Sequence, residues 1–232
     1  MKLYVGTSGY SYPPWKGPFY PSKLPAKQML AYYSEHFGAV ESNYTFKHLP
    51  TVALLQRWAA TVPAGFRFAL KAPEQITHRQ RLKDTELSLA SFIDSARALH
   101  TRLGPLLFQL PPSFPKDVPR LRAFLALLPP ECRVAFEFRH PSWFDHEVFE
   151  ALRHCGVALC LADEDDRLQV PIVATTTWGC LRLRRLDYDD DALKAWLGCV
   201  QAQDWCDAFV FFKHDDEAKG LHLAKRFLAL AT

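Results

Sequence analysis

The chain lacks the long apolar run that a membrane-spanning helix requires, because no stretch approaches ~20 consecutive apolar residues. The amino-terminal segment Met1–Thr7 is also too short an apolar run for a secretory signal. No internal repeat, low-complexity tract or linker interrupts the sequence. We therefore expect a cytoplasmic protein with no membrane contact, folded as one domain over residues 1–232.

Metal-binding cysteine patterns are missing as well. None of the 6 cysteines has C-x-x-C spacing, and no pair of histidines flanks them as a zinc site requires. Several lie in apolar runs, such as Leu159-Cys160-Leu161, which indicates buried, reduced thiols. A divalent metal held by carboxylates and histidines stays open, but no spacing in the chain predicts one.

A strong charge of either sign is also absent, since the formal net charge is only +3. This excludes a polycationic tail and is compatible with an anionic substrate. Hydrophobic residues make up 49% and charged residues 23%, so a chain of this length can bury an adequate core without disulfides.

What the chain does contain is an alternation of short apolar runs with helical patterns. The expected strands are Leu3–Gly6, Ala39–Asn43, Phe66–Lys71, Pro105–Leu110, Arg133–Phe138, Val157–Leu161, Trp178–Leu183 and Ala208–Phe212. The expected helices are Lys27–Phe37, Thr51–Ala60, Thr85–Leu103, Val118–Leu128, Asp145–His154, Asp190–Gln201 and Ala218–Leu230. Strands that alternate with helices predict parallel βαβ units, and eight such units predict a (β/α)₈ TIM-barrel-like fold.

The sixth unit departs from this regularity, because the segment around Leu168–Val173 shows no clear helical pattern. An open, doubly wound sheet is the alternative fold. Such a sheet normally carries a glycine-rich phosphate loop after its first strand, and Gly6-Thr-Ser-Gly9 matches that loop only weakly.

Chemistry concentrates in the segment Val134–Trp143. Glu137 and Arg139 have the same parity, so both side chains should leave the same face of a strand. His140 and Trp143 follow immediately in a proline-containing loop. In a parallel α/β fold the carboxyl ends of the strands are where sites form, so this segment predicts a site.

The ends of the other expected strands carry further candidates. The proposed catalytic set is Glu137, Arg139, His140, Glu41, Lys71 and His78. The proposed substrate-binding set is Trp15, Asn43, Gln109, Trp143, Arg182, Arg184 and Lys213. Trp15 belongs to a first loop rich in aromatic residues and proline, whose rings suit stacking on a sugar or a base.

Each candidate also has a structural interpretation. Glu41 can pair with Arg139 or Lys71 and fill the polar end of a barrel, and Lys71 or His78 can simply be solvated. The acidic turn 163–166 can be exposed, although Asp163 lies nearest the strand. The aromatic loop can be a hydrophobic plug. Charged side chains on a buried strand are costly unless they are paired, so a structural ion pair also accounts for Glu137.

Several motifs resemble the DUF72 family, also called YecE-like. They are Trp15–Pro21, Val40–Phe46, Phe66–Pro73 with Thr77-His78, Gly104–Pro112 and Phe136–Trp143. The resemblance implies a TIM-barrel-like fold but little about function, because the family is uncharacterised. This chain departs from the family pattern after strand seven, where Arg-x-His-Gly is replaced by Arg182-Leu-Arg-Arg185, and after strand eight, where Lys213-His214 stands. These extra cations favour a more anionic ligand.

Three functions fit these residues. The first is an enzyme acting on a phosphosugar or a nucleic acid phosphodiester. Cations would bind the phosphate, Glu137 or Glu41 would act as general base, and His140 or His78 would act as general acid. The second is a non-catalytic protein that binds nucleic acid or a small ligand. The third is a glycosidase-like hydrolase with Glu41 and Glu137 as its paired carboxylates.

Overall fold

The computed structural model describes residues 1–164, 168–213 and 217–231. Its eight strands are β1 (Lys2–Thr7), β2 (Ala39–Ser42), β3 (Arg67–Lys71), β4 (Leu103–Gln109), β5 (Val134–Glu137), β6 (Ala158–Asp163), β7 (Trp178–Leu183) and β8 (Asp207–Phe212). All neighbouring pairs are parallel, in the order β1-β8-β7-β6-β5-β4-β3-β2. The expected TIM-barrel-like architecture is confirmed.

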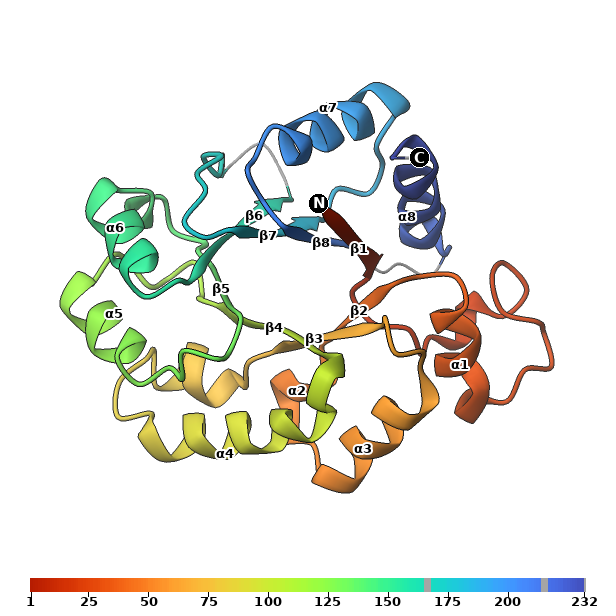
Figure 1. Ribbon diagram of the computed structural model, residues 1–232, viewed down its shortest axis with the longest axis horizontal. Coiled ribbons are helices and arrows are strands. Elements are labelled where there is room, and N and C mark those ends of the chain that lie inside the picture. Colours follow the sequence, from red (N-terminus) through yellow and green to blue (C-terminus); the bar gives the residue numbers. More distant parts are fainter. Residues whose placement is uncertain (165–167, 214–216, 232) are drawn as a thin grey trace.

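Helices surround this sheet (Figure 1). They are α1 (Met29–Ser34), α2 (Tyr44–Lys47), α3 (Val52–Thr61), α4 (Glu86–Ala96), α5 (Val118–Leu125), α6 (His146–His154), α7 (Asp190–Gln201) and α8 (Lys219–Leu230). Shorter turns of 3₁₀ helix are η1 (Pro13–Trp15), η2 (Ala26–Gln28), η4 (Arg97–Arg102) and η5 (Pro141–Trp143), and η3 (Gln75–Arg79) is a π-helix. Thr51 caps α3 as expected, with its hydroxyl accepting the amide hydrogen of Leu54 at 3.3 Å.

Two helices depart from the sequence pattern. The expected helix Thr85–Leu103 ends as α4 at Ala96 and continues as η4, which is kinked at His100, where φ is 48°. The described part of the β6–β7 connection, residues 164 and 168–177, contains no helix. The expected irregularity of the sixth unit is therefore present. No helix of the described residues is long and apolar enough to cross a bilayer.

The barrel is nearly closed, with its seam between β1 and β2. These strands share one isolated backbone bridge, between Ser8 and Glu41. The Tyr33 hydroxyl adds to the closure: it accepts the amide hydrogen of Thr7 at 2.7 Å and donates to the carbonyl of Ala39 at 3.1 Å. A side chain thus joins the two strands where the regular ladder is missing.

Strand alternation divides the buried side chains into two groups. One residue parity forms the apolar filling of the barrel, with Tyr4, Ala39, Ala69, Leu107, Ala135, Ala158, Cys160, Trp178, Cys180, Phe209 and Phe211. The opposite parity packs against the surrounding helices in a larger cluster. Two residues further along several strands, the inward parity becomes charged or polar, at the carboxyl end that we call the barrel mouth.

The seam leads to a prediction about Gly6. An added Cβ at this position would lie 1.8 Å from the carbonyl oxygen of Ala39, which is backbone and cannot move aside. We expect Gly6→Ala to lower the free energy of unfolding by about 3 kcal/mol or more in denaturant titrations. The matched control is Gly198→Ala in α7, where a Cβ meets nothing within 4 Å and should stabilise the helix by ~0.5–1 kcal/mol. Equal stability of the two variants would contradict this account of the seam.

Candidate functional site

The centre of the barrel mouth is a buried arginine that bridges two buried glutamates. Arg182 of β7 donates from Nε and Nη2 to the two carboxylate oxygens of Glu41 on β2, at 2.7 and 2.8 Å. Its Nη1 donates to Oε2 of Glu137 on β5 at 2.6 Å. Glu41 and Glu137 are 0% exposed and Arg182 is 1% exposed. One guanidinium therefore joins three strands across the barrel.

A second layer continues this network toward solvent. Arg139 contacts the other oxygen of Glu137 through Nε and contacts Glu164 through Nη1. Arg184 reaches the same Glu164 carboxylate at 3.5 Å. Together the two layers contain three carboxylates and three guanidiniums, so the network itself is neutral. The expected proximity of Glu137 and Arg139, based on strand parity, is confirmed.

The electrostatics of this network oppose a role for its glutamates as general bases. Burial alone would raise the pKa of Glu137, but the charges of Arg182 and Arg139 outweigh it and lower the pKa to about 2. Burial would also raise the pKa of Glu41, but the charge of Arg182 outweighs burial and lowers that pKa below its usual value. Both carboxylates accept hydrogen bonds on each oxygen. At neutral pH they are therefore ionised and weak bases.

Lys71, at the end of β3, has different surroundings. Its Nζ donates to Oε1 of Gln109 at 2.7 Å and lies 4.1 Å from the centre of the Phe46 ring. Among the described residues no carboxylate lies within ion-pair distance of Nζ. Burial and the charge of Arg182 lower the pKa of Lys71 to about 8, despite the opposing effect of Glu41. This amine is therefore partly neutral at mildly alkaline pH.

His78 joins the same neighbourhood from η3. Its ring lies 5.1 Å from the Phe46 ring, edge to face, and its Nδ1 is 2.9 Å from the Thr77 hydroxyl. Burial and the charge of Lys71 lower the pKa of His78, although Glu74 opposes the shift. Lys71, Gln109 and His78, which the sequence proposed separately, thus lie together.

Arg184 is the least neutralised guanidinium of the network. Burial and the charge of Arg182 lower its pKa, and its carboxylate contact is the long one to Glu164. Lys213 follows β8, and its amide hydrogen bonds to the carbonyl of Leu183 at 3.0 Å. Its neighbour in the sequence motif, His214, lies outside the described residues. Arg184 and Lys213 therefore place the two extra cations of this chain at the ends of β7 and β8.

The structure corrects the expectation for Trp15 and Trp143. Both indoles are 0% exposed, so neither presents a face on which a ligand could stack. Trp15 packs on Tyr12 and Tyr20 in the core, with ring centres 4.7 and 6.4 Å away. Trp143 stacks on Phe138 at 4.8 Å and donates from Nε1 to the carbonyl of Phe114. The plug interpretation holds for these two rings.

His140 and Asn43 lie at the mouth but contribute mainly to local structure. Nδ1 of His140 accepts the amide hydrogen of Ser142 at 3.2 Å and lies 2.8 Å from its hydroxyl, so the imidazole caps η5. Asn43 precedes α2 at its N-cap position, without a side-chain capping bond. These hydrogen bonds of His140 are thus local to η5 and do not place its ring against the buried network.

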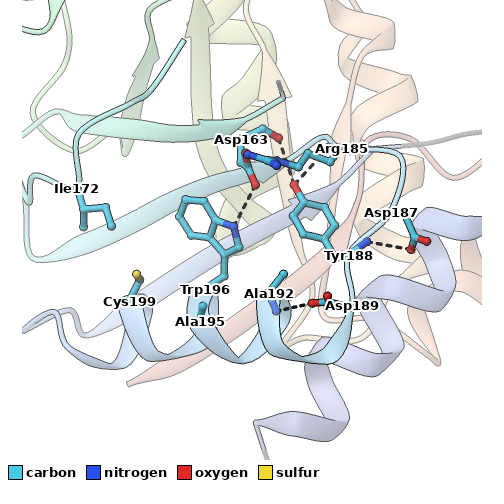
Figure 2. A pocket seen from close by; sticks show the side chains of 10 residues that line it. All are labelled: Asp163, Ile172, Arg185, Asp187, Tyr188, Asp189, Ala192, Ala195, Trp196 and Cys199. Carbon is cyan, nitrogen blue, oxygen red and sulfur yellow. Dashed lines mark hydrogen bonds and ion pairs between the residues drawn. The ribbon is translucent and has the colours of Figure 1, made fainter. Parts of the chain in front are cut away.

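Asp163, considered as a candidate in the acidic turn, points away from the barrel interior. Figure 2 shows its carboxylate between Arg185, whose Nε lies 2.7 Å away, and Nε1 of Trp196, 3.1 Å away. These residues line a separate pocket of about 470 Å³ beside α7. The Asp163 side chain points outward because it alternates along the strand with the inward-facing Ala162 and Glu164.

Glu164 is the site residue that sequence reasoning missed. The same alternation that sends Asp163 outward directs Glu164 inward, one position beyond the end of β6. That signal was available in the sequence. Phe46 carried no comparable signal, because its contact with Lys71 depends on the short helix α2 folding back toward β3.

The described residues contain no group of three or more histidine, cysteine, aspartate or glutamate side chains placed to hold a metal ion. Glu41 and Glu137 are separated by the guanidinium of Arg182, and Asp163 faces the other side of the strand. All 6 cysteines are free thiols, and Cys160 and Cys180 are buried in the barrel filling.

The network predicts how Arg182→Met affects stability. Removing the guanidinium leaves the buried Glu41 without its ion-pair partner and Glu137 with Arg139 alone, which should cost about 3–5 kcal/mol of unfolding free energy at neutral pH. The loss should shrink as the pH falls, because protonation of Glu41 and Glu137 then relieves their buried charge. Urea titrations at several pH values measure both effects.

The unfolding free energy of the native protein should decrease as the pH falls. Because the pKa of Glu137 is lowered to about 2, the contribution of this carboxylate to stability is complete above its unfolded pKa of 4.5 and is lost as the pH falls toward 2.

The control for Arg182→Met is Arg226→Met, which removes an exposed ion pair with Asp190 and should change stability by ~1 kcal/mol or less. A similar loss in both variants would contradict a special role for Arg182.

Comparisons with known proteins identify relatives of the chain. The chain is 33% identical over 143 residues to the protein YecE of Escherichia coli (strain K12), which covers 61% of this chain and 50% of that protein. It is 29% identical over 157 residues to YunF of Bacillus subtilis (strain 168), covering 64% and 54%. The chain thus spans about half the length of the curated relatives it matches.

Solved structures match over the whole barrel. A DUF72 family protein from Thermotoga maritima superposes with a TM-score of 0.90 at 27% identity, covering 100% of this chain and 99% of that one. One from Enterococcus faecalis, at 18% identity, shows the same fold with a TM-score of 0.80 over 98% and 94%. The family model described as protein of unknown function DUF72 matches residues 4–232, and the protein therefore belongs to the DUF72 family.

Proposed function

We propose that the protein is an enzyme that acts on a small phosphate-bearing substrate at the barrel mouth. Arg139 and Arg184 bind the phosphate, and Lys71 is the reactive group. The observation that carries this proposal is the position of Lys71, a largely buried ammonium next to a neutral network and, among the residues that the structure describes, without a carboxylate partner. An anionic ligand would supply the missing negative charge.

The glutamates have a positioning role in this proposal. Glu137 orients Arg139, and Glu164 orients both Arg139 and Arg184, so the guanidiniums are held before a ligand arrives. Preorganised guanidiniums bind phosphate through charge-assisted hydrogen bonds. Arg182 takes no direct part, because its donors are directed at Glu41 and Glu137 and its side chain is buried. Of the proposed catalytic residues, Lys71 and His78 therefore remain for proton transfer.

A glycosidase mechanism fits this arrangement poorly. It requires one carboxylic acid that is protonated near neutral pH and a second free carboxylate. Here Glu41 and Glu137 share the same guanidinium, and both pKa values are lowered. Neither group is suited to donate a proton to a leaving group.

Binding of a nucleic acid is the second candidate. Its supporting observation is Tyr44, at the start of α2 and 48% exposed, with Leu49 and Val52 similarly exposed nearby in the chain. An exposed ring of this kind suits base stacking. A steep salt dependence of oligonucleotide binding without turnover would favour this function over an enzyme.

Glycerol 3-phosphate, with glycerol as its uncharged counterpart, tests the proposed anion site by calorimetry. We expect measurable affinity for the phosphate ester alone. Arg184→Gln should weaken binding about tenfold, since a hydrogen bond to a charged group contributes roughly 1.5–3 kcal/mol. Lys194→Met, at an exposed position of α7, is the control and should leave affinity unchanged.

The affinity for glycerol 3-phosphate should fall as the pH rises. A bound phosphate favours the protonated form of Lys71, so affinity should be complete below its pKa of about 8 and fall as the pH rises above it. The expected loss is about tenfold between pH ~7 and ~9. Equal binding of glycerol and its phosphate, or an affinity independent of pH, would contradict the proposed site.

A further inference from the structure

Lys71 combines features that suit a nucleophile. Its Nζ is largely buried at the barrel mouth, yet the residue retains some exposure. The hydrogen-bond acceptor beside it is the amide oxygen of Gln109, and its other close neighbour is the Phe46 ring. A carboxylate in either place would hold the ammonium charged. An amide and an aromatic ring stabilise the ammonium less than a carboxylate does, so the neutral amine is easier to reach.

We propose that Lys71 forms an imine with the carbonyl group of a small phosphate-bearing aldehyde or ketone. This inference rests on the proposed function, because the phosphate site supplied by Arg139 and Arg184 would hold such a substrate beside Nζ. It goes beyond that function by naming the carbonyl as the reacting group and Lys71 as the covalent catalytic residue.

The covalent step balances without an oxidant or a reductant. The lone pair of neutral Nζ forms a bond to the carbonyl carbon, and the nitrogen passes one proton to the former carbonyl oxygen, which gives a carbinolamine. A second proton, taken from solvent, converts the hydroxyl into water, and the carbon–oxygen bond breaks as the carbon–nitrogen double bond forms. One amine, one carbonyl and one proton become a protonated imine and one water.

The neighbouring groups match the needs of each stage. The neutral amine donates one N–H to Oε1 of Gln109 and keeps its lone pair for the carbonyl carbon. The protonated imine has a single N–H, which the same oxygen accepts, and its positive charge faces the Phe46 ring. His78, which contacts the same ring and is partly exposed, is the group that would relay the proton that releases water.

The lowered pKa makes this reaction selective. Lys71, with a pKa of about 8, has far more neutral amine near pH 7.5 than a surface lysine at ~10.4. The neutral fractions differ by roughly two orders of magnitude. An amine of lower pKa is also intrinsically less nucleophilic, which reduces the advantage of Lys71. We therefore expect Lys71 to be labelled at least about tenfold faster than a surface lysine.

The test is reductive trapping of the full chain with glycolaldehyde phosphate and cyanoborohydride, followed by peptide mapping. We expect Lys71 to be labelled at least about tenfold faster than any other lysine, and Lys71→Arg to lose that fast phase. In the unmodified protein the labelling rate should rise with pH to a midpoint near 8. This profile tests the inference even if the variant does not fold. The control is the variant Lys194→Met, in which Lys71 should be labelled at the same rate as in the unmodified protein.

The outcomes separate the imine from the phosphate site. Labelling spread over surface lysines, or a Lys71 midpoint above pH 10, would overturn the inference, even if glycerol 3-phosphate still binds and the proposed function stands. Fast labelling of Lys71 supports the inference. If phosphate-free glycolaldehyde labels Lys71 equally fast and glycerol 3-phosphate does not compete, the imine chemistry is supported and the phosphate site is not.

Discussion

The contact of Arg182 with Glu41 and Glu137 is the constraint on which the barrel mouth depends. It joins residues that are 141 and 45 positions apart in the chain and lie on three different strands. Three buried charges are unfavourable unless each is matched, so none of these residues is free to change alone. The pair of hydrogen bonds to Glu41 also fixes the plane of the guanidinium. Through Glu137 that geometry extends to Arg139, and through Glu164 to Arg184.

This constraint separates structural charge from reactive charge. The network satisfies its own carboxylates, and among the described residues the contacts of the Lys71 ammonium are an amide oxygen and an aromatic ring. The charge of Arg182 acts on Lys71 as well. The positive charge of Arg182 therefore has two effects. It keeps the glutamates ionised, and it disfavours the ammonium form of Lys71. Burial, the larger cause, and the guanidinium of Arg182 together favour the neutral amine at Lys71, and the same guanidinium suppresses base chemistry at the glutamates.

The sequence predicted the barrel well because strand and helix signals are local. Apolar runs, a threonine cap and an irregular sixth unit all depend on neighbouring residues. It also grouped Glu137 with Arg139, since both lie on one strand end. It did not predict that the donors of Arg182 would all be paired with Glu41 and Glu137, because these residues lie on separate strands across the barrel. Nor did composition reveal that Trp15 and Trp143 are buried, since aromatic residues in proline-rich loops occur equally as plugs and as ligand rims.

Strand alternation was the strongest source of information about direction, and it explains the separation of the two acidic neighbours at the end of β6. Asp163 faces outward to Arg185 and Trp196, whereas Glu164 faces inward to Arg139 and Arg184. Exchanging the two by a one-residue shift would remove the carboxylate that holds both outer guanidiniums and place it in the side pocket instead. The inward glutamate therefore determines that the mouth presents oriented arginines beside Lys71, rather than two mobile cations that repel each other and the lysine.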